Sequence, residues 1–264
     1  MKKIKLYELL CKNFAYEDKE AKSLIMAGKV FVDNKLIDKP GECVYDNSVI
    51  TIKDNKKKYV TRSGYKLEKA ISYFNIDVKN KIAVDIGASE GGFTDCLLQH
   101  GIGKVYSVDV AYGILAWKIR QDSRVIPLER TNARLLSFKN IGEYADIITV
   151  DVSFISLKLI FPVINDILHA NGECICLIKP QFEAPANEVG KNGVITNTTV
   201  LLKIIHDLIT HAEYNQLNIN GLTYSPIRGN NGAIEYLLYL KRDKKYNDDE
   251  VKNIIQAVIT ESLA

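Results

Sequence analysis

Residues 84–95 read "VDIGASEGGFTD", and this stretch decides the fold class. An apolar strand-like run leads into a glycine-rich loop, and a helical pattern follows it. Gly87, Gly91 and Gly92 let a ligand approach the backbone closely, at the carboxyl end of a strand where open α/β sheets bind their ligands. The spacing G-x-x-x-G-G differs from the dinucleotide fingerprint, and no G-K-[ST] follows, so the loop is not a P-loop.

Outward from this loop, strand-like and helical patterns alternate. Apolar runs typical of buried strands lie at residues 81–87, 104–110, 124–129, 146–152 and 173–180. Patterns typical of helices lie at residues 64–74, 91–101, 113–122 and 154–171. Strands separated by helices predict a parallel sheet with helices on both faces. Residues 221–242 have no helix between their two extended runs, which predicts a closing antiparallel hairpin that turns at residues 229–232.

The first 55 residues form a separate small module. Apolar spacing over residues 4–26, broken near 16–19, predicts two short helices, and Gly28 ends the second. Residues 29–37 predict a hairpin that turns at Asp33 and Asn34, and residues 49–52 predict a further strand. A module of this length is near the lower size at which a domain folds alone.

Positive charge is concentrated in the N-terminal part of the chain. Residues 1–60 carry 13 Lys and Arg against 9 Asp and Glu, whereas the whole chain has a net charge of only +3. Exposed lysines are most often a solvated surface, but on a small module they also suit the phosphate backbone of a nucleic acid. Glu17 and Asp18 reduce this positive charge locally.

Composition excludes several classes of protein. No apolar stretch reaches the roughly 18 residues of a spanning helix, and charge interrupts the N-terminus too early for a signal peptide, so a cytoplasmic location is expected. Five cysteines without a C-x-x-C pair fit a reducing compartment, and Cys174 and Cys176 alternate within one strand as core residues. His206 and His211 do not align on a helix face, and no metal site is expected.

Two polar residues follow neighbouring strands beyond the glycine loop. Asp109 ends the second strand, where a carboxylate accepts hydrogen bonds from a ribose diol. Asn132 ends the third strand, where its amide suits a purine edge. This combination describes S-adenosylmethionine binding as well as nucleotide binding, and it favours a methyltransferase over a dehydrogenase.

Charged residues also end the fourth and fifth strands. Asp151 and Lys179 point at the ligand crevice, and one interpretation is a structural ion pair. The alternative is catalysis, because methylating an alcohol requires an aligned hydroxyl and a base for its proton, which a lysine in a dry site supplies. Glu235 is an isolated acid in an apolar strand, and Lys66 and Lys69 begin the helix before the first strand.

Several passages together resemble one known family. They are "TRSGYKLEKA", "DIGASEGGFTD", "VDVAYGILAWKIR", "LERTNAR", "DVSFISL" and "IKPQFEA" with "GVI". Over nearly the whole chain they resemble the TlyA, or haemolysin A, family of ribosomal RNA 2′-O-ribose methyltransferases. The resemblance implies an S4-like RNA-binding domain at residues 1–55, a linker at 56–63 and an FtsJ-like, Rossmann-like class I methyltransferase domain at 64–264. It also implies a seven-stranded, mostly parallel sheet.

The resemblance further implies the reaction and the residues that perform it. The donor is S-adenosylmethionine, and the acceptor is a cytidine 2′-hydroxyl in ribosomal RNA or ribosomal subunits. The protein is expected to act as a monomer, with no metal ion and no membrane as partner. The catalytic residues implied are Lys66, Asp151, Lys179 and Glu235. Those implied for the donor are Gly87, Ala88, Ser89, Gly91, Gly92, Phe93, Asp109 and Asn132. RNA contacts are expected at Lys3, Lys5, Lys12, Lys22, Lys29 and Arg62.

Two other functions stay open at this point. The family's historical name suggests a membrane-active cytolysin, although the sequence has no strongly amphipathic basic helix. A non-catalytic RNA-binding protein on the same fold is the other alternative, and the presence of all four catalytic residue types counts against it.

Overall fold

A computed structural model describes residues 2–14, 16–52, 58–190, 193–229, 232–243 and 246–263. The chain divides into two compact units, Met1–Lys58 and Tyr59–Ala264. Lys56 and Lys57 of the expected linker, and residues 230–231 of the expected hairpin turn, lie outside the described residues.

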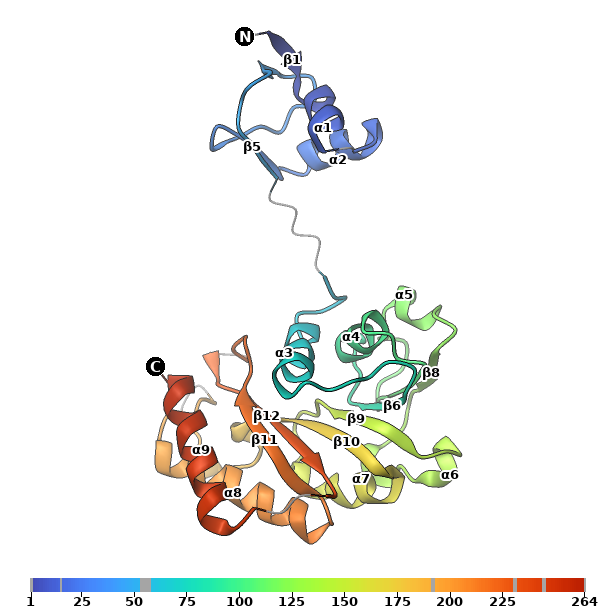
Figure 1. The fold of residues 1–264 in the computed structure, drawn as a ribbon, viewed down its shortest axis with the longest axis vertical. Helices are drawn as coiled ribbons and strands as arrows, with labels where there is room; N and C mark the ends of the chain where they lie inside the picture. Colours follow the sequence, from blue (N-terminus) through green and yellow to red (C-terminus); the bar gives the residue numbers. More distant parts are fainter. Residues whose placement is uncertain are drawn as a thin grey trace. The chain divides into compact units, whose positions relative to one another are not determined.

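The first unit is built from two helices and two small antiparallel sheets (Figure 1). Its elements are β1 Lys3–Lys5, α1 Leu6–Phe14, α2 Asp18–Met26, β2 Val30–Val32, β3 Lys35–Leu36, β4 Cys43–Tyr45 and β5 Ile50–Ile52. Strand β2 pairs with β3 and β5, and β1 pairs with β4. The predicted hairpin is confirmed, because Asp33 and Asn34 both adopt left-handed φ angles of 49° and 66°, as a two-residue turn of type I′ requires.

The second unit contains a seven-stranded sheet in the order β11-β12-β10-β9-β6-β7-β8. Its strands are β6 Ile82–Ile86, β7 Lys104–Val108, β8 Val125–Leu128, β9 Ala145–Val150, β10 Leu168–Ile178, β11 Asn218–Tyr224 and β12 Tyr236–Lys241. The five strands from β6 to β10 pair in parallel, and β11 and β12 form an antiparallel hairpin at one edge. The predicted mostly parallel sheet with a closing hairpin is therefore confirmed.

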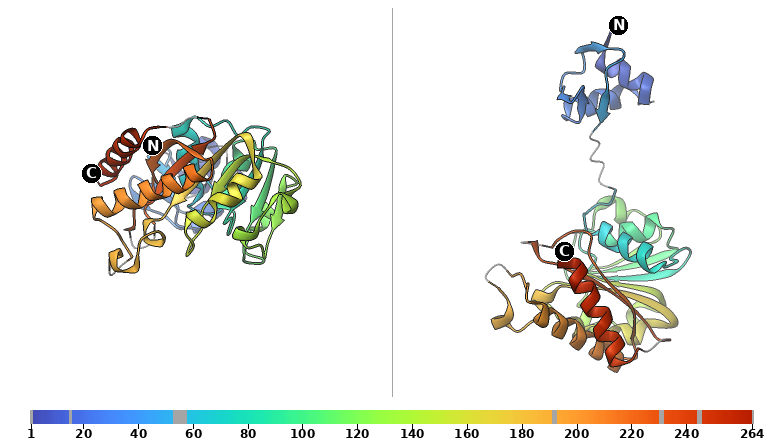
Figure 2. Two further views of the ribbon diagram at one scale, coloured as in Figure 1. Left: turned by 90° about the horizontal axis from the view of Figure 1, so that it is seen from below. Right: turned by 60° about the vertical axis from the view of Figure 1, so that its left-hand side comes forward.

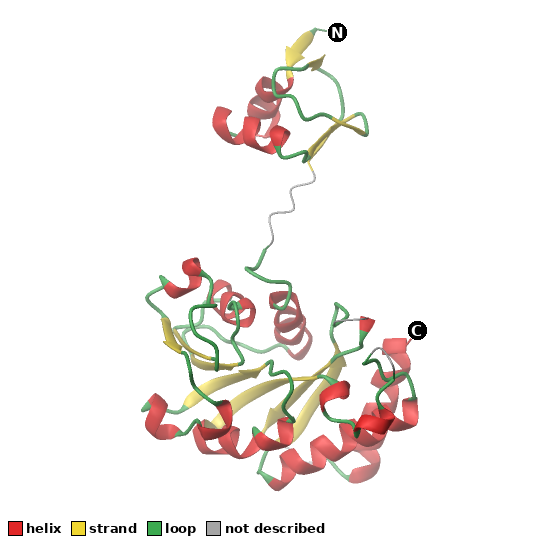
Figure 3. Ribbon diagram, turned by 180° about the vertical axis from the view of Figure 1, so that it is seen from behind, coloured by secondary structure: helices red, strands yellow, loops and turns green. Residues whose placement is uncertain are grey.

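Helices cover both faces of this sheet (Figures 1 and 3). The α-helices are α3 Gly64–Phe74, α4 Gly92–Gln99, α5 Trp117–Arg120, α6 Phe138–Ile141, α7 Phe161–Ile167, α8 Thr198–Tyr214 and α9 Asp248–Leu263. Short 3-10 helices lie at η1 Ala133–Leu135, η2 Leu157–Leu159, η3 Pro180–Phe182 and η4 Ala186–Glu188. One apolar core lies between the sheet and α3, α4 and α5, and the other lies between the sheet and α6 to α9. Figure 2 shows α8 and α9 side by side on their face.

Strand order places a crevice at the carboxyl ends of β6 and β9. From β6 the chain adds β7 and β8 on one side, then returns to add β9 and β10 on the other. Ligands bind at such a reversal in open α/β sheets, because the connections on either side leave in opposite directions. The ends of β6 and β9 meet closely there, since the Asp151 N–H donates to the Ile86 carbonyl at 3.0 Å.

The structure differs from the sequence prediction in four places. The helix predicted through Asn171 ends at Ile167, because Leu168 already pairs with Ala145 and β10 continues past a register shift before Glu173. The helix predicted at 113–122 is reduced to α5, and the two longest helices, α8 and α9, were not predicted as elements.

The fourth difference concerns residues 59–63, assigned to a linker by the resemblance. They belong to the second unit. The Tyr59 ring is buried against Gly64 at the start of α3, and the Val60 N–H donates to Asp95 Oδ2 at 2.7 Å. This segment is part of the packed domain because its aromatic ring completes the core beneath α3 and α4.

Candidate active site

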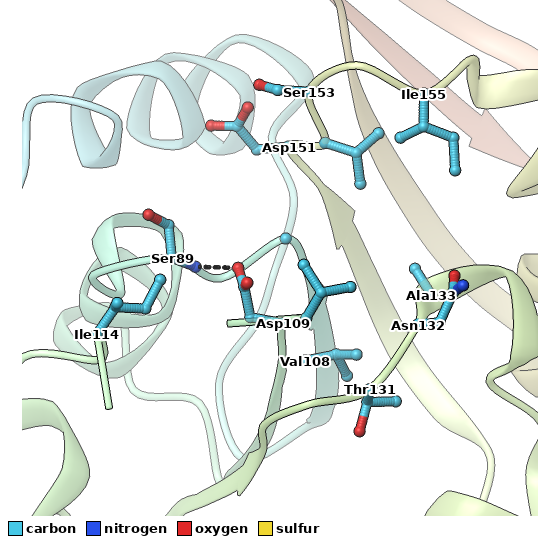
Figure 4. Close-up of a pocket in the computed structure, with 13 residues that line it drawn as sticks. Ser89, Val108, Asp109, Ile114, Thr131, Asn132, Ala133, Asp151, Ser153 and Ile155 are labelled. Carbon is cyan, nitrogen blue, oxygen red and sulfur yellow. Dashed lines mark hydrogen bonds between the residues drawn. The ribbon is translucent and has the colours of Figure 1, made fainter. Parts of the chain in front are cut away.

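Two adjoining cavities open at the carboxyl ends of the parallel strands. The Asp109 cavity, of about 300 Å³, is drawn in Figure 4 and lies over the ends of β6, β7, β8 and β9. The Lys179 cavity, of about 480 Å³, adds residues from α3, α4 and the end of β10. Both are lined by Gly87, Ser89, Asp151 and Ser153, so they form two halves of one crevice.

Gly87 is required by the close approach of two strand ends. Its φ is +85°, and a Cβ there would lie 2.5 Å from the backbone oxygen of Asp151. Gly91 and Gly92 were expected at the donor, but neither lines these two cavities. A Cβ on Gly91 would meet Leu115 at 2.9 Å, and one on Gly92 would meet Ser63 Oγ at 1.9 Å. Their immediate role in the structure is therefore to allow close packing around the loop.

Asp109 fastens the glycine loop to the end of β7. Its Oδ2 accepts the Ser89 N–H at 2.8 Å (Figure 4), and its Oδ1 accepts the Ala111 N–H at 2.8 Å. Asn132 lines the same cavity from the loop after β8, and its Oδ1 accepts the Arg134 N–H at 3.1 Å. Of the other residues expected at the donor, Ala88 and Phe93 line the Lys179 cavity.

Lys179 and Asp151 form an ion pair where β9 and β10 end. The two strands are parallel neighbours, with Cys176 opposite Val150, so the residues that follow them come close together. Lys179 Nζ lies 2.5 Å from Asp151 Oδ1 and donates to Ser153 Oγ at 2.8 Å. Lys179 and Asp151 are 11% and 15% exposed, so the pair is largely screened from water yet reaches the cavity.

Lys66 and Glu235 form a second, more deeply buried pair. Lys66 Nζ in α3 lies 2.5 Å from Oε2 of Glu235, and both side chains are less than a tenth exposed. Glu235 directly precedes β12, one residue before the strand expected to contain it. Lys66, Asp151 and Lys179 line the Lys179 cavity, whereas Glu235 reaches it through Lys66. The structure therefore brings the four expected catalytic residues together as two ion pairs.

Three polar residues of the crevice were missed by sequence reasoning. Thr61 and Ser63 line the Lys179 cavity on either side of Arg62, and their hydroxyls are 2.7 Å apart. Ser153 follows Asp151 and lines both cavities. A short polar residue two positions after a strand-end carboxylate is the signal that could have identified Ser153.

A buried acid supports the glycine loop from behind. Asp85 is fully buried in β6 and accepts hydrogen bonds from Thr94 Oγ1 at 2.7 Å and Thr149 Oγ1 at 2.8 Å. Burial raises the pKa of Asp85 to about 6, although the two threonine hydrogen bonds act in the opposite direction. Asp85 thus links β6, α4 and β9 beneath the crevice.

The first unit carries five of the six residues expected to contact RNA. Lys3 lies over the Tyr45 ring at 5.7 Å, while Lys5 and Lys22 lie over the Tyr7 ring at 6.0 and 4.4 Å. Lys22 also pairs with Asp18 at 2.6 Å, and this hydrogen bond raises the pKa of its ammonium group. Lys12 is exposed in α1 and Lys29 follows α2, whereas Arg62 lies at the Lys179 cavity of the second unit.

Comparison with known proteins supplies a family for this geometry. The model of the FtsJ-like methyltransferase family matches residues 59–242, which include both cavities and both ion pairs. The chain belongs to the FtsJ-like methyltransferases. Within this family it is 42% identical to YqxC of Bacillus subtilis, over 97% of this chain and 94% of that protein.

Other FtsJ-like relatives also match over nearly their whole length. The chain is 35% identical to the 16S/23S rRNA (cytidine-2′-O)-methyltransferase TlyA of Mycobacterium tuberculosis, over 96% of each chain. A solved structure described as a hemolysin from Streptococcus thermophilus is 38% identical and superposes with a TM-score of 0.75, covering 100% of this chain and 96% of that one. This FtsJ-like chain therefore belongs with the TlyA and hemolysin A proteins, as its sequence motifs predict.

Neither a metal-binding cluster nor a membrane-spanning helix occurs in the described part of the chain. There, no cluster of three or more His, Cys, Asp and Glu side chains is arranged to hold a metal ion. Within the same residues, no helix is long and apolar enough to span a membrane.

Proposed function

We propose that this protein transfers a methyl group from S-adenosylmethionine to the 2′-hydroxyl of a cytidine in ribosomal RNA, as a cytoplasmic monomer. The observation that carries the proposal is the Lys179–Asp151 pair at the junction of two cavities, one suited to a donor and one to an acceptor. The named activity of the M. tuberculosis relative supports the same reaction.

The Asp109 cavity fits the donor in its chemistry. Val110, Ile114, Val152 and Ile155 give it an apolar wall suited to a flat heteroaromatic ring. Asp109 uses each carboxylate oxygen for one backbone N–H and retains lone pairs for ribose hydroxyls. When bound, S-adenosylmethionine supplies an electrophilic methyl group.

Lys179 is the base in this proposal. In its neutral form its amine accepts the proton of the 2′-hydroxyl, so that the oxygen becomes a better nucleophile. Asp151 orients the amine and balances the ammonium that results. Lys66, held by Glu235, adds a positive charge to the same cavity, which favours release of the hydroxyl proton.

The exposed ring of Phe154 is suited to stack against an unstacked nucleotide base. Phe154 is 89% exposed with a φ of +63°, an unusual backbone conformation for an aromatic residue, and its ring centroid lies 4.8 Å from that of Phe182. Phe154 follows Ser153 in the chain, and the Phe182 N–H donates to the Lys179 carbonyl at 2.9 Å, so the two rings belong to the segments that carry Ser153 and Lys179. Unstacked RNA bases commonly rest on exposed aromatic rings in this way.

We further propose that the first unit is an S4-like domain that binds RNA phosphates. Lys3, Lys5 and Lys12 are exposed on it, and Tyr7 and Tyr45 lie beneath neighbouring ammonium groups. Cations beside aromatic rings suit both parts of an RNA strand, the phosphate and the base.

Lys179→Arg and Lys179→Ala test the reaction. Arginine keeps the positive charge but does not lose its proton near neutral pH, so both variants should lower kcat by about 10²–10⁴. Lys139→Ala, at an exposed position of α6, is the matched control and should retain wild-type turnover. The readout is methyl transfer to ribosomal RNA, with the modified nucleotide mapped. Wild-type activity in Lys179→Ala would contradict the proposed base.

The hemolysin description of the S. thermophilus structure motivates a second test. Purified protein should not release dye from liposomes in the absence of S-adenosylmethionine, while it binds that donor in a calorimeter. Leakage without donor binding would favour a membrane-active protein over the proposed methyltransferase.

A further inference from the structure

We propose that Ser153 is a positioning residue for Lys179. Its hydroxyl holds the lysine side chain so that the amine lone pair faces the acceptor in the Lys179 cavity. This inference rests on the proposed function, because it assigns a role within the same reaction.

An uncharged lysine amine can make only a small number of hydrogen bonds. A neutral lysine amine has two N–H groups and one lone pair. Asp151 Oδ1 lies 2.5 Å from Lys179 Nζ, and Ser153 Oγ accepts from the same nitrogen at 2.8 Å. The ion-pair distance to Asp151 and the hydrogen bond to Ser153 place both oxygens within reach of the two N–H groups, and a neutral amine that uses both has one direction left for its lone pair.

That direction is fixed only if both acceptors are present. With Asp151 alone, the amine can rotate about its terminal bond, and its lone pair turns away from the acceptor in most orientations. Proton transfer requires the two heavy atoms within hydrogen-bond reach and correctly aligned, so lost orientation lowers the rate of the chemical step. Substrate binding should depend far less on this orientation.

The place of Ser153 in the fold suits such a role. It lies two residues beyond Asp151 in the loop after β9 and lines both cavities, at the point where donor and acceptor would meet. Ser153 is exposed in the crevice and is not part of the apolar core. Core packing therefore does not explain why a hydroxyl side chain stands at this position. The Lys66–Glu235 pair has no such hydroxyl partner among the described residues.

The inference is tested in the full-length protein with two variants, Ser153→Ala and Ser153→Thr. The control is Ser72→Ala, at an exposed position of α3. Ser153→Ala should lower kcat for ribosomal RNA methylation about tenfold or more, with KM for RNA and the dissociation constant of S-adenosylmethionine within about twofold of wild type. Ser153→Thr keeps the hydroxyl and should recover at least about half of the lost turnover. Ser72→Ala should match wild type.

The possible results separate this inference from the reaction itself. Wild-type kcat in Ser153→Ala, a loss that appears only in KM, or equal impairment of the Thr and Ala variants would overturn the role of Ser153 and leave the proposed function standing. If wild-type protein transfers no methyl group to ribosomal RNA, the proposed function fails, and the inference fails with it. Unchanged thermal unfolding of Ser153→Ala would exclude a folding defect as the cause of lost turnover.

Discussion

Lys66 and Lys69 lie three residues apart on α3, yet they occupy different chemical environments. Lys66 is 6% exposed and pairs with Glu235 beside the crevice. Lys69 lies over the Tyr224 ring at 3.7 Å, and burial lowers the pKa of its ammonium group. The sequence pattern alone does not show which of the two joins Lys179 as the second lysine of the site. The family resemblance was needed to select Lys66. The contact that separates them is made by Glu235, about 170 residues along the chain, which no local pattern describes.

This difference predicts unequal costs of removing the two side chains. Lys66→Ala leaves the Glu235 carboxylate buried without its partner and should lower the free energy of unfolding by about 3–5 kcal/mol. Lys69→Ala removes a cation–ring contact and should cost about 1 kcal/mol or less. Urea unfolding at neutral pH measures both, and Lys66→Arg, which keeps the charge, should recover part of the loss. Equal destabilisation by the two alanine variants would show that the buried pair has no special weight.

At the level of elements, the sequence was most informative where local chemistry determines the conformation. Asp33 and Asn34 tolerate left-handed φ angles, so the hairpin turn was predictable from two residues. The extension of β10 back to Leu168 was not predictable from local sequence, because the pairing of Leu168 with Ala145 on β9 overrides the apparent helical spacing. The placement of Asp151 and Lys179 at the crevice was predictable from their charge at the ends of apolar strands. The packing of residues 59–63 depends on contacts with α3 and α4, so no local sequence pattern indicates it.

Residues 61–63 pack closely against Gly92 at the start of α4. Adding a single methyl group at Gly92 should therefore lower both stability and activity. In Gly92→Ala, the new Cβ would lie 1.9 Å from Ser63 Oγ and 2.2 Å from Thr61 Oγ1, so these hydroxyl groups, or the segment that carries them, must shift. Such overpacking typically costs about 1–3 kcal/mol, and the shift should also lower methyl transfer, because Thr61, Arg62 and Ser63 line the Lys179 cavity.

Gly41→Ala is the matched control for this substitution. Nothing lies within 4 Å of a Cβ at Gly41, which is in the first unit and has an ordinary φ. Thermal unfolding and turnover should therefore be near wild type for Gly41→Ala and reduced for Gly92→Ala. A Gly92→Ala protein with unchanged stability and activity would mean that residues 61–63 can move without affecting the site.

Over the whole molecule, the excess positive charge lies in the first unit and the candidate active site lies in the second. Residues 1–60 hold an excess of positive charge, whereas the remaining residues carry about as many acids as bases. The crevice with its two lysine–carboxylate pairs lies in the second unit. If the first unit supplies the contacts to RNA phosphates, affinity and turnover should respond to different substitutions.

The salt dependence of RNA binding tests this division. Each phosphate contact adds about 0.7–0.9 to the slope of log affinity against log salt, so the triple variant Lys3→Ala, Lys5→Ala and Lys12→Ala should reduce that slope by about 2–3. Replacing the exposed second-unit residues Lys79, Lys139 and Lys203 by alanine removes the same charge and should change the slope by less than about 1. At saturating RNA the first variant should keep wild-type kcat, because its substitutions lie in the other unit from Lys179. Equal slopes for the two triple variants would mean that affinity follows total charge, and the first unit would then not be the part that binds RNA phosphates.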